Sequence, residues 1–228
     1  MKKVKVATVG LCALTMVGMG CSTKAGTGAL IGTGSGTAVG ALIGALAGNT
    51  AVGAAVGAAV GAGAGALIGK HMDKVAAETA AQVKNGKVEE VTDANGLKAV
   101  KVTFDNGILF PVGKYALQAA AKNELSKFSN VLKNNADLQV DIQGYASSDG
   151  SNEVNQVLSN NRANSVKAYL VNTCGVPSSQ IKSARGFGET NLITNADGTE
   201  NVKASRRVEV YLYASQDMID KANAGQLN

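Results

Sequence analysis

Polar and apolar residues are distributed very differently on the two sides of residue 70. No charged residue occurs from Ala25 to Gly69, and glycine recurs there at every fourth position. The repeat runs from Gly28 to Gly48 and resumes in a new register from Gly53 to Gly69, with Asn49-Thr50 at the break. Because asparagine is common in turns, the pattern predicts two helices joined as a hairpin.

The two predicted arms have the length and polarity of segments that meet a bilayer. At 1.5 Å per residue, residues 28–48 span about 31 Å and residues 51–69 about 28 Å, close to the roughly 30 Å of a hydrocarbon core. A flexible linker is the alternative, but the Leu-Ile pairs of this segment are too apolar for one. Glycine at this spacing allows close helix packing, and the segment resembles the glycine-zipper regions of bacterial envelope proteins. Crossing the bilayer, lying on it and self-association stay open as alternatives.

Beyond residue 70 the pattern is that of a globular domain. Residues 70–86 are polar and predict a helix or connector. Two alternating segments, 88–91 and 100–104, predict a β-hairpin around a turn at 93–96. Residues 114–133 predict an amphipathic helix, because their apolar side chains fall on one face. These are Leu117, Ala121, Leu125, Phe128 and Leu132.

A strand–helix–strand unit follows this helix. Alternation predicts a strand at 138–145, a helix at 152–171 and a strand near 181–187, with a spacing that suits parallel pairing of the two strands. A final strand is predicted at the alternating residues Val208, Val210 and Leu212. The pattern therefore predicts an α/β (α+β) fold, a two-layer sandwich of a small mixed β-sheet and helices over residues 87–213, with a C-terminal tail at 214–228.

An arginine lies where the helix predicted at 152–171 should be apolar. On a helical wheel, Arg162 and Asn155 both fall within the apolar face, between Leu158 and Val166. Arginine is rarely buried without a partner, so this position needs an explanation. One interpretation is an ion pair inside the domain or a surface arginine that reaches past its neighbours. The other is a guanidinium that lines a cleft and binds a carboxylate.

The N-terminus has the pattern of an export signal. Lysines at positions 2, 3 and 5 precede an apolar run, residues 6–19, which is shorter than the roughly 18–20 residues of a membrane span. Residues 17–21 (VGMGC) resemble the signal of bacterial lipoproteins, although Gly18 stands where leucine is usual. The resemblance implies a signal peptide at 1–20, lipid on Cys21 and, with Ser22, sorting to the outer membrane. Plain secretion is the alternative.

Composition removes several classes of function. The formal net charge of +5 falls to 19 basic against 17 acidic residues once the three signal lysines are left out, and no basic patch with aromatic residues predicts nucleic-acid binding. One histidine and three scattered cysteines make zinc clusters and Ser-His-Asp triads untenable, so we expect no metal, no cofactor and no enzyme activity. A wall hydrolase would need two carboxylates about a cleft, and only Asp149 is a visible candidate.

Four ordered blocks between residues 100 and 213 resemble the OmpA-like peptidoglycan-binding domain. They are VTFDNGILF, GYASSDGSNEVNQVLSNNRANSVKAYL, GVPSSQIKSARGFGETN and ASRRVEVYL. In that family, an aspartate in the loop and an arginine in the next helix hold the diaminopimelate residue of the peptidoglycan stem peptide. That residue ends in a zwitterion, and an acid and an arginine are its natural partners.

The resemblance carries over residue by residue, with two departures, one of which is that Pro111 follows Phe110 where the family often has an acid. The family arginine falls on Arg162, and Asn155 and Leu158 match the segment before it. The family pattern G-H-T-D-x-x-G is GYASSDG here, so Ser147 stands in place of the aspartate. Asp149 is the expected substitute, and the alternative is that it favours the positive end of the next helix. Arg206 is expected to face the site and Arg207 to point away from it.

Together these features predict a non-catalytic outer-membrane lipoprotein. Lipid on Cys21 and the hairpin of residues 21–69 would hold it in the outer membrane, with the C-terminal domain binding peptidoglycan in the periplasm. The alternative is a membrane-embedded protein that forms homo-oligomers through the glycine zipper and binds the wall weakly or not at all.

Overall fold

The computed structural model describes residues 60–227. The predicted signal peptide, Cys21 and the glycine-rich segment up to residue 59 lie outside the described residues. The helices and strands follow in the order α1 (Ala62–Gln82), β1 (Gly86–Thr92), β2 (Lys98–Asp105), α2 (Asn106–Leu109), α3 (Ala119–Asn134), β3 (Leu138–Gly144), α4 (Asn152–Ala168), a π-turn (Tyr169–Thr173), a 3-10 turn (Ser178–Gln180), β4 (Ile181–Gly186), α5 (Val202–Ser205), β5 (Arg207–Ala214) and α6 (Gln216–Asn223).

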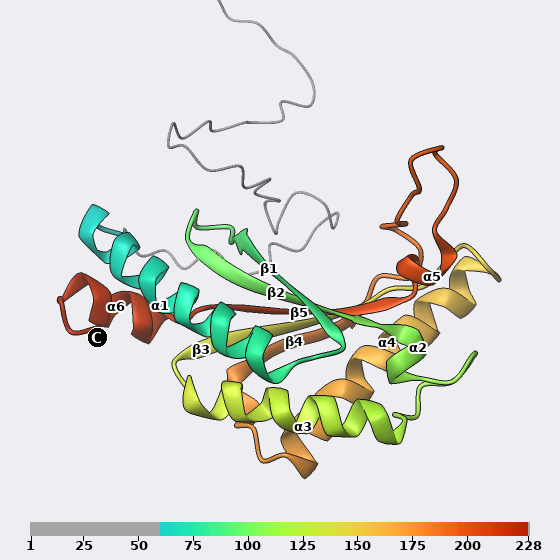
Figure 1. Ribbon diagram of the computed structural model, residues 1–228, viewed down its shortest axis with the longest axis horizontal. Coiled ribbons are helices and arrows are strands. Elements are labelled where there is room, and N and C mark those ends of the chain that lie inside the picture. The colour runs from blue at the N-terminus through green and yellow to red at the C-terminus, as the bar shows by residue number, and fades with distance from the viewer. Residues whose placement is uncertain (1–59, 228) are drawn as a thin grey trace, which may run out of the picture. The chain divides into compact units, whose positions relative to one another are not determined.

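The five strands form one mixed sheet in the order β1-β2-β5-β3-β4. β1 and β2 pair as the predicted hairpin, and the only parallel pair among the described strands is β3 with β4, joined by α4. Figure 1 shows helices α3 and α4 packed along one side of this sheet. The predicted fold class, a mixed sheet layered with helices, is confirmed.

The core lies between the sheet and its helices. One face of the sheet is apolar, because alternate residues of neighbouring strands are in register: Val102 pairs with Val210, which also pairs with Ile142. Helix α3 contributes Phe128, whose ring meets that of Phe104 edge-on at 5.9 Å between centroids. The other face carries polar and tyrosine side chains, and Asp141 and Gln143, which alternate with the apolar residues of β3, are buried there.

Helix α1 joins the glycine-rich segment to the domain without a break. Ala64, Ile68, Met72 and Val75 follow helical spacing and are buried in the core. The boundary that the sequence predicts between residues 69 and 70 therefore falls inside one helix, because its buried face runs across the change in polarity. No described atom lies within 4 Å of a Cβ built on Gly65 or Gly69. Among the helices of residues 60–227, none combines the length and the apolar character that a membrane crossing requires.

Several ends of elements differ from the predicted ones. Helix α3 begins at Ala119 rather than at residue 114, and residues 111–118 form a loop with Leu117 partly buried. Helix α4 keeps α geometry only to Ala168 and then widens into the π-turn. Residues 216–223 form helix α6, which begins with a cap from Ser215 and contacts α1.

Two glycines at the strand ends let α4 pack directly onto the sheet. A Cβ on Gly144 would lie 2.2 Å from the carbonyl oxygen of Ser159, and one on Gly186 would lie 2.1 Å from the backbone nitrogen of Asn160. Both contacts are with backbone, which does not move aside as a side chain does. This close approach fixes the height of α4 above β3 and β4, and with it the position of Arg162.

We expect Gly186→Ala to destabilise the protein by about 3 kcal/mol, because the new methyl group forces helix and strand apart. Gly69→Ala is the matched control, since its Cβ meets no described atom, and it should be neutral or stabilising by up to about 1 kcal/mol. Urea unfolding followed by circular dichroism measures both. Equal midpoints for the two variants would contradict the close packing.

Candidate functional site

A cavity of about 520 Å³ opens where α4, the loop after β3 and the segment before β5 meet. All six residues that the sequence predicts for the binding site line it. They are Ser147, Asp149, Asn155, Leu158, Arg162 and Arg206. Their assembly in one place follows from the fold, because the loop and helix α4 follow β3 directly while Arg206 precedes β5, which pairs with β3.

Arg162 is a buried cation without an acidic partner in residues 60–227. Its side chain has 3% exposure, its Nε donates to the carbonyl oxygen of Lys114 at 3.1 Å, and its guanidinium carbon lies 5.5 Å from the ring centre of Phe110. Burial, together with the charge of Arg206, lowers the pKa of Arg162 to about 10, so it stays charged at neutral pH. Its terminal nitrogens have no described acceptor, which leaves them available to a carboxylate in the cavity.

The loop residues form a closed network with Arg206. The Ser147 hydroxyl accepts from Arg206 Nε at 2.9 Å and donates to Asp149 Oδ2 at 3.2 Å, and Arg206 Nη2 donates to the same Asp149 oxygen. Asp149 is therefore paired within the protein. The N-cap of α4 is Ser151, not Asp149.

Asn155 and Leu158 complete the wall formed by α4. The Asn155 amide donates to the carbonyl oxygen of Ser147 at 3.0 Å and to Glu189 Oε2 at 2.9 Å, which ties the loop to the helix. Leu158 is half-buried and supplies an apolar surface. Asn155 thus positions the loop, whereas Leu158 offers contact area.

Sequence reasoning missed Asp105 and Lys203, which also line the cavity. Asp105 ends β2, accepts from the backbone N–H of Gly107 at 2.7 Å and lies 3.7 Å from Lys203 Nζ. Asp105 lies within the VTFDNGILF block. Its position in a block that resembles the family was the signal that could have indicated it. No signal in the sequence indicated Lys203, because helix α5 reaches the cavity only through the tertiary structure.

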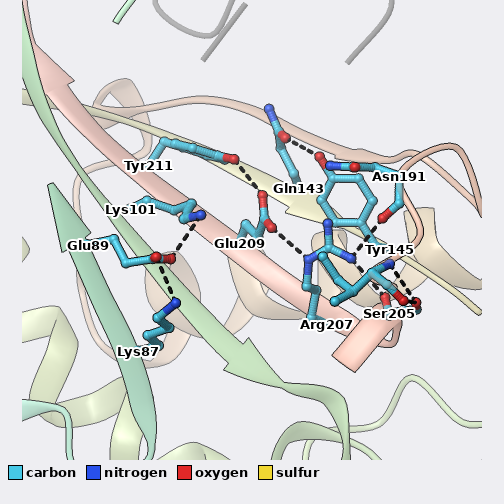
Figure 2. Close-up of polar contacts among 11 residues, drawn as sticks. Lys87, Glu89, Lys101, Gln143, Tyr145, Asn191, Ser205, Arg207, Glu209 and Tyr211 are labelled. Carbon is cyan, nitrogen blue, oxygen red and sulfur yellow. Dashed lines mark hydrogen bonds and ion pairs between the residues drawn. The ribbon is translucent and has the colours of Figure 1, made fainter. Parts of the chain in front are cut away.

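Arg207 points to the opposite face of the sheet, as predicted, and is a structural residue there (Figure 2). Its Nε donates to Glu209 Oε1 at 2.6 Å, and its Nη1 donates to the carbonyl oxygens of Asn191 and Ser205 at 3.1 Å each. The guanidinium stacks 4.1 Å above the ring of Tyr145. These bonds fix the turn from which Arg206 emerges.

Comparison with known proteins now decides the family. The sequence pattern of the OmpA family matches residues 109–223, half of the chain, and covers all six lining residues named above. The chain belongs to the OmpA family. A second pattern, the glycine zipper, matches residues 31–76 and so ends within helix α1.

Two relatives and one solved structure illustrate the likeness. "Probable lipoprotein YiaD" of Escherichia coli (strain K12) is 33% identical over 111 residues, 49% of this chain and 50% of that protein. Outer membrane protein A of Serratia marcescens is 33% identical over 132 residues, 52% of this chain and 36% of that protein. The chain therefore spans half of these relatives' length or less. The periplasmic domain of Helicobacter pylori MotB shares the fold, with a TM-score of 0.50 at 17% identity, covering 62% of this chain and 90% of that one.

Proposed function

We propose that this OmpA-family chain is a non-catalytic protein that binds peptidoglycan and tethers the outer membrane to the cell wall. Arg162 binds the free carboxylate of diaminopimelate in the stem peptide. Lipid on Cys21 and the glycine zipper hold the chain to the outer membrane, with the C-terminal domain in the periplasm. Envelope location is supported by the relatives, which are named as an outer membrane protein and a lipoprotein.

The observation that carries this proposal is the unpaired charge of Arg162. A desolvated guanidinium without a counter-ion is unfavourable in a folded domain, and a carboxylate ligand in the cavity relieves that cost. The cavity also offers Leu158 and Phe110 to the methylene chain that separates the diaminopimelate zwitterion from the peptide.

A hydrolase is disfavoured by the same cavity. Its two acids, Asp105 and Asp149, both face cations of the protein, Lys203 and Arg206. Glycoside hydrolysis needs one carboxylic acid and one carboxylate on opposite sides of the scissile bond. We expect no release of soluble muropeptides after prolonged incubation with sacculi, measured by chromatography.

Retention on purified sacculi tests the proposed binding. The purified protein should co-sediment with diaminopimelate-type sacculi, free diaminopimelate should release it, and lysine-type sacculi, which lack that carboxylate, should not retain it. Equal retention on both kinds of sacculi would contradict recognition through Arg162.

Self-assembly through the zipper is the second candidate. It is favoured by Gly65 and Gly69, which no described residue covers. Deleting residues 25–59 should then dissolve oligomers seen by analytical ultracentrifugation in detergent. The deletion stops there because Ala64 and Ile68 belong to the core. Oligomers that survive the deletion combined with Gly65→Leu and Gly69→Leu would remove this candidate.

A further inference from the structure

The basic and acidic residues that line the cavity do not all form pairs of opposite charge. Asp105 faces Lys203, and Asp149 is held by Arg206, so each lining acid already has a basic partner. Within residues 60–227, Arg162 alone has a charge that no acid of the cavity balances. The charged lining residues thus leave one cation, Arg162, without an acid, and no acid without a basic neighbour.

Two other acids touch the loop but are bound by the protein as well. Glu200 accepts from the backbone N–H and the hydroxyl of Ser148, and hydrogen bonding to that hydroxyl lowers the pKa of Glu200. Glu189 accepts from the amide of Asn155. Neither glutamate lines the cavity, so neither replaces the missing loop aspartate as a partner for an ammonium group.

We propose that Arg206 occupies, as an internal cation, the acidic half of the site, so that the cavity selects its ligand by the carboxylate and is nearly indifferent to the ligand's ammonium group. This role rests on the proposed binding of the stem peptide. A ligand ammonium that reaches Asp149 meets a carboxylate whose charge the Arg206 guanidinium already balances. The ammonium then shares one carboxylate with a second cation that repels it, so its net gain is small.

The network around Ser147 favours this state over a loose surface pair. An exposed ion pair alone contributes little, and Asp149 is 61% exposed in its side chain. Here, however, Arg206 holds Asp149 through Nη2 and the buried Ser147 hydroxyl through Nε, and that hydroxyl also donates to Asp149. An aspartate at position 147 would give Arg206 one acid and leave a second for the ligand. Serine removes that second acid.

Three stem peptides that differ in one residue separate the two charges. The residue is diaminopimelate, 2-aminopimelate, which keeps the carboxylate but lacks the ammonium, or lysine, which keeps the ammonium but lacks the carboxylate. For the wild-type protein, we expect diaminopimelate and 2-aminopimelate to bind within about threefold of each other in calorimetric titration. The lysine peptide should bind at least about 30-fold more weakly.

Variants of the pair then shift the selectivity in a defined direction. Arg206→Gln frees Asp149, so the diaminopimelate peptide should bind about tenfold tighter than the 2-aminopimelate peptide. Asp149→Asn removes the acid, and the two peptides should stay within about threefold of each other. Arg185→Gln is the matched control, since Arg185 is exposed on β4 and does not line the cavity; it should behave like the wild type.

The outcomes distinguish this inference from the proposed function. A wild-type preference for diaminopimelate over 2-aminopimelate of about tenfold or more, unchanged in Arg206→Gln, would overturn the role of Arg206 while leaving wall binding intact. If Asp105→Asn abolished such a preference, the ammonium would belong to Asp105. Absence of binding by all three peptides to the wild type would overturn the proposed function itself.

Discussion

Arg162→Met will abolish retention of the protein on diaminopimelate-type sacculi and leave the domain at least as stable as the wild type. Loss of a desolvated charge partner typically costs about 2–5 kcal/mol of binding free energy, which exceeds what the remaining contacts of a small ligand supply. Methionine keeps most of the apolar volume of arginine and carries no charge to desolvate. Co-sedimentation measures the retention, and urea unfolding measures the stability.

The stability half of this prediction follows from the sign of the pKa shift. The native pKa of Arg162 is about 10, well below that of a free guanidinium, so the unfolded chain binds this proton more tightly than the native state does. The charged side chain therefore opposes folding at every pH below about 10, and this cost decreases only as the pH rises above about 10. The stability difference between Arg162→Met and wild type should accordingly be constant from about pH 6 to 9.

Arg185→Met is the control for Arg162→Met, because it removes an exposed arginine outside the cavity. It should keep wild-type retention. A large destabilisation by Arg162→Met would instead assign Arg162 to the internal structure of the domain. Retention that survives the substitution would remove it from the binding site.

Arg207→Met, in contrast to Arg162→Met, will destabilise the domain. We expect a loss of about 3–5 kcal/mol in the free energy of unfolding. The substitution leaves Glu209, which is 5% exposed, without its cation. It also removes two hydrogen bonds to backbone carbonyls and the stacking on Tyr145. Chemical denaturation followed by circular dichroism measures the loss.

The double variant Arg207→Met/Glu209→Gln tests the cause. Glutamine is neutral and still accepts the hydrogen bond that the Tyr211 hydroxyl donates to Glu209. The double variant should recover about half of the lost stability, because the uncompensated charge is gone while the backbone contacts are still missing. If the double variant were as unstable as the single one, the buried charge of Glu209 would not be the cause.

Arg162 and Arg207 show which features of the fold could be predicted from the sequence. Helical spacing placed Arg162 inside an apolar face, and alternation placed Arg207 away from Arg206, and both positions are as predicted. The pattern contained nothing about partners, because Glu209 and the carbonyl oxygens reach Arg207 through the register of β5 and through a loop. Whether a buried arginine is paired or free is therefore a property of the tertiary structure.

The same limit applies to the residues that line the cavity. Its side formed by the loop and α4 is contiguous in the chain, so residues 147 to 162 were predictable from spacing and from the family resemblance. Lys203 and the carbonyl of Lys114 belong to segments that are distant in sequence from residues 147–162, so spacing could not predict their positions. The pairing of Asp149 with Arg206 was not predicted, because it depends on how the loop after β3 meets the segment before β5.

Helix α1 has a mechanical consequence. Because Ile68 and Met72 are buried in the core and belong to the same helix as the end of the glycine zipper, the described part of the chain has no slack between the two. A pull on the N-terminal end of α1 is transmitted as shear across packed side chains rather than taken up by an extending linker. A load applied there would be resisted by β1, β2, α3 and α6, against which α1 packs, and α1 would be the first element to detach.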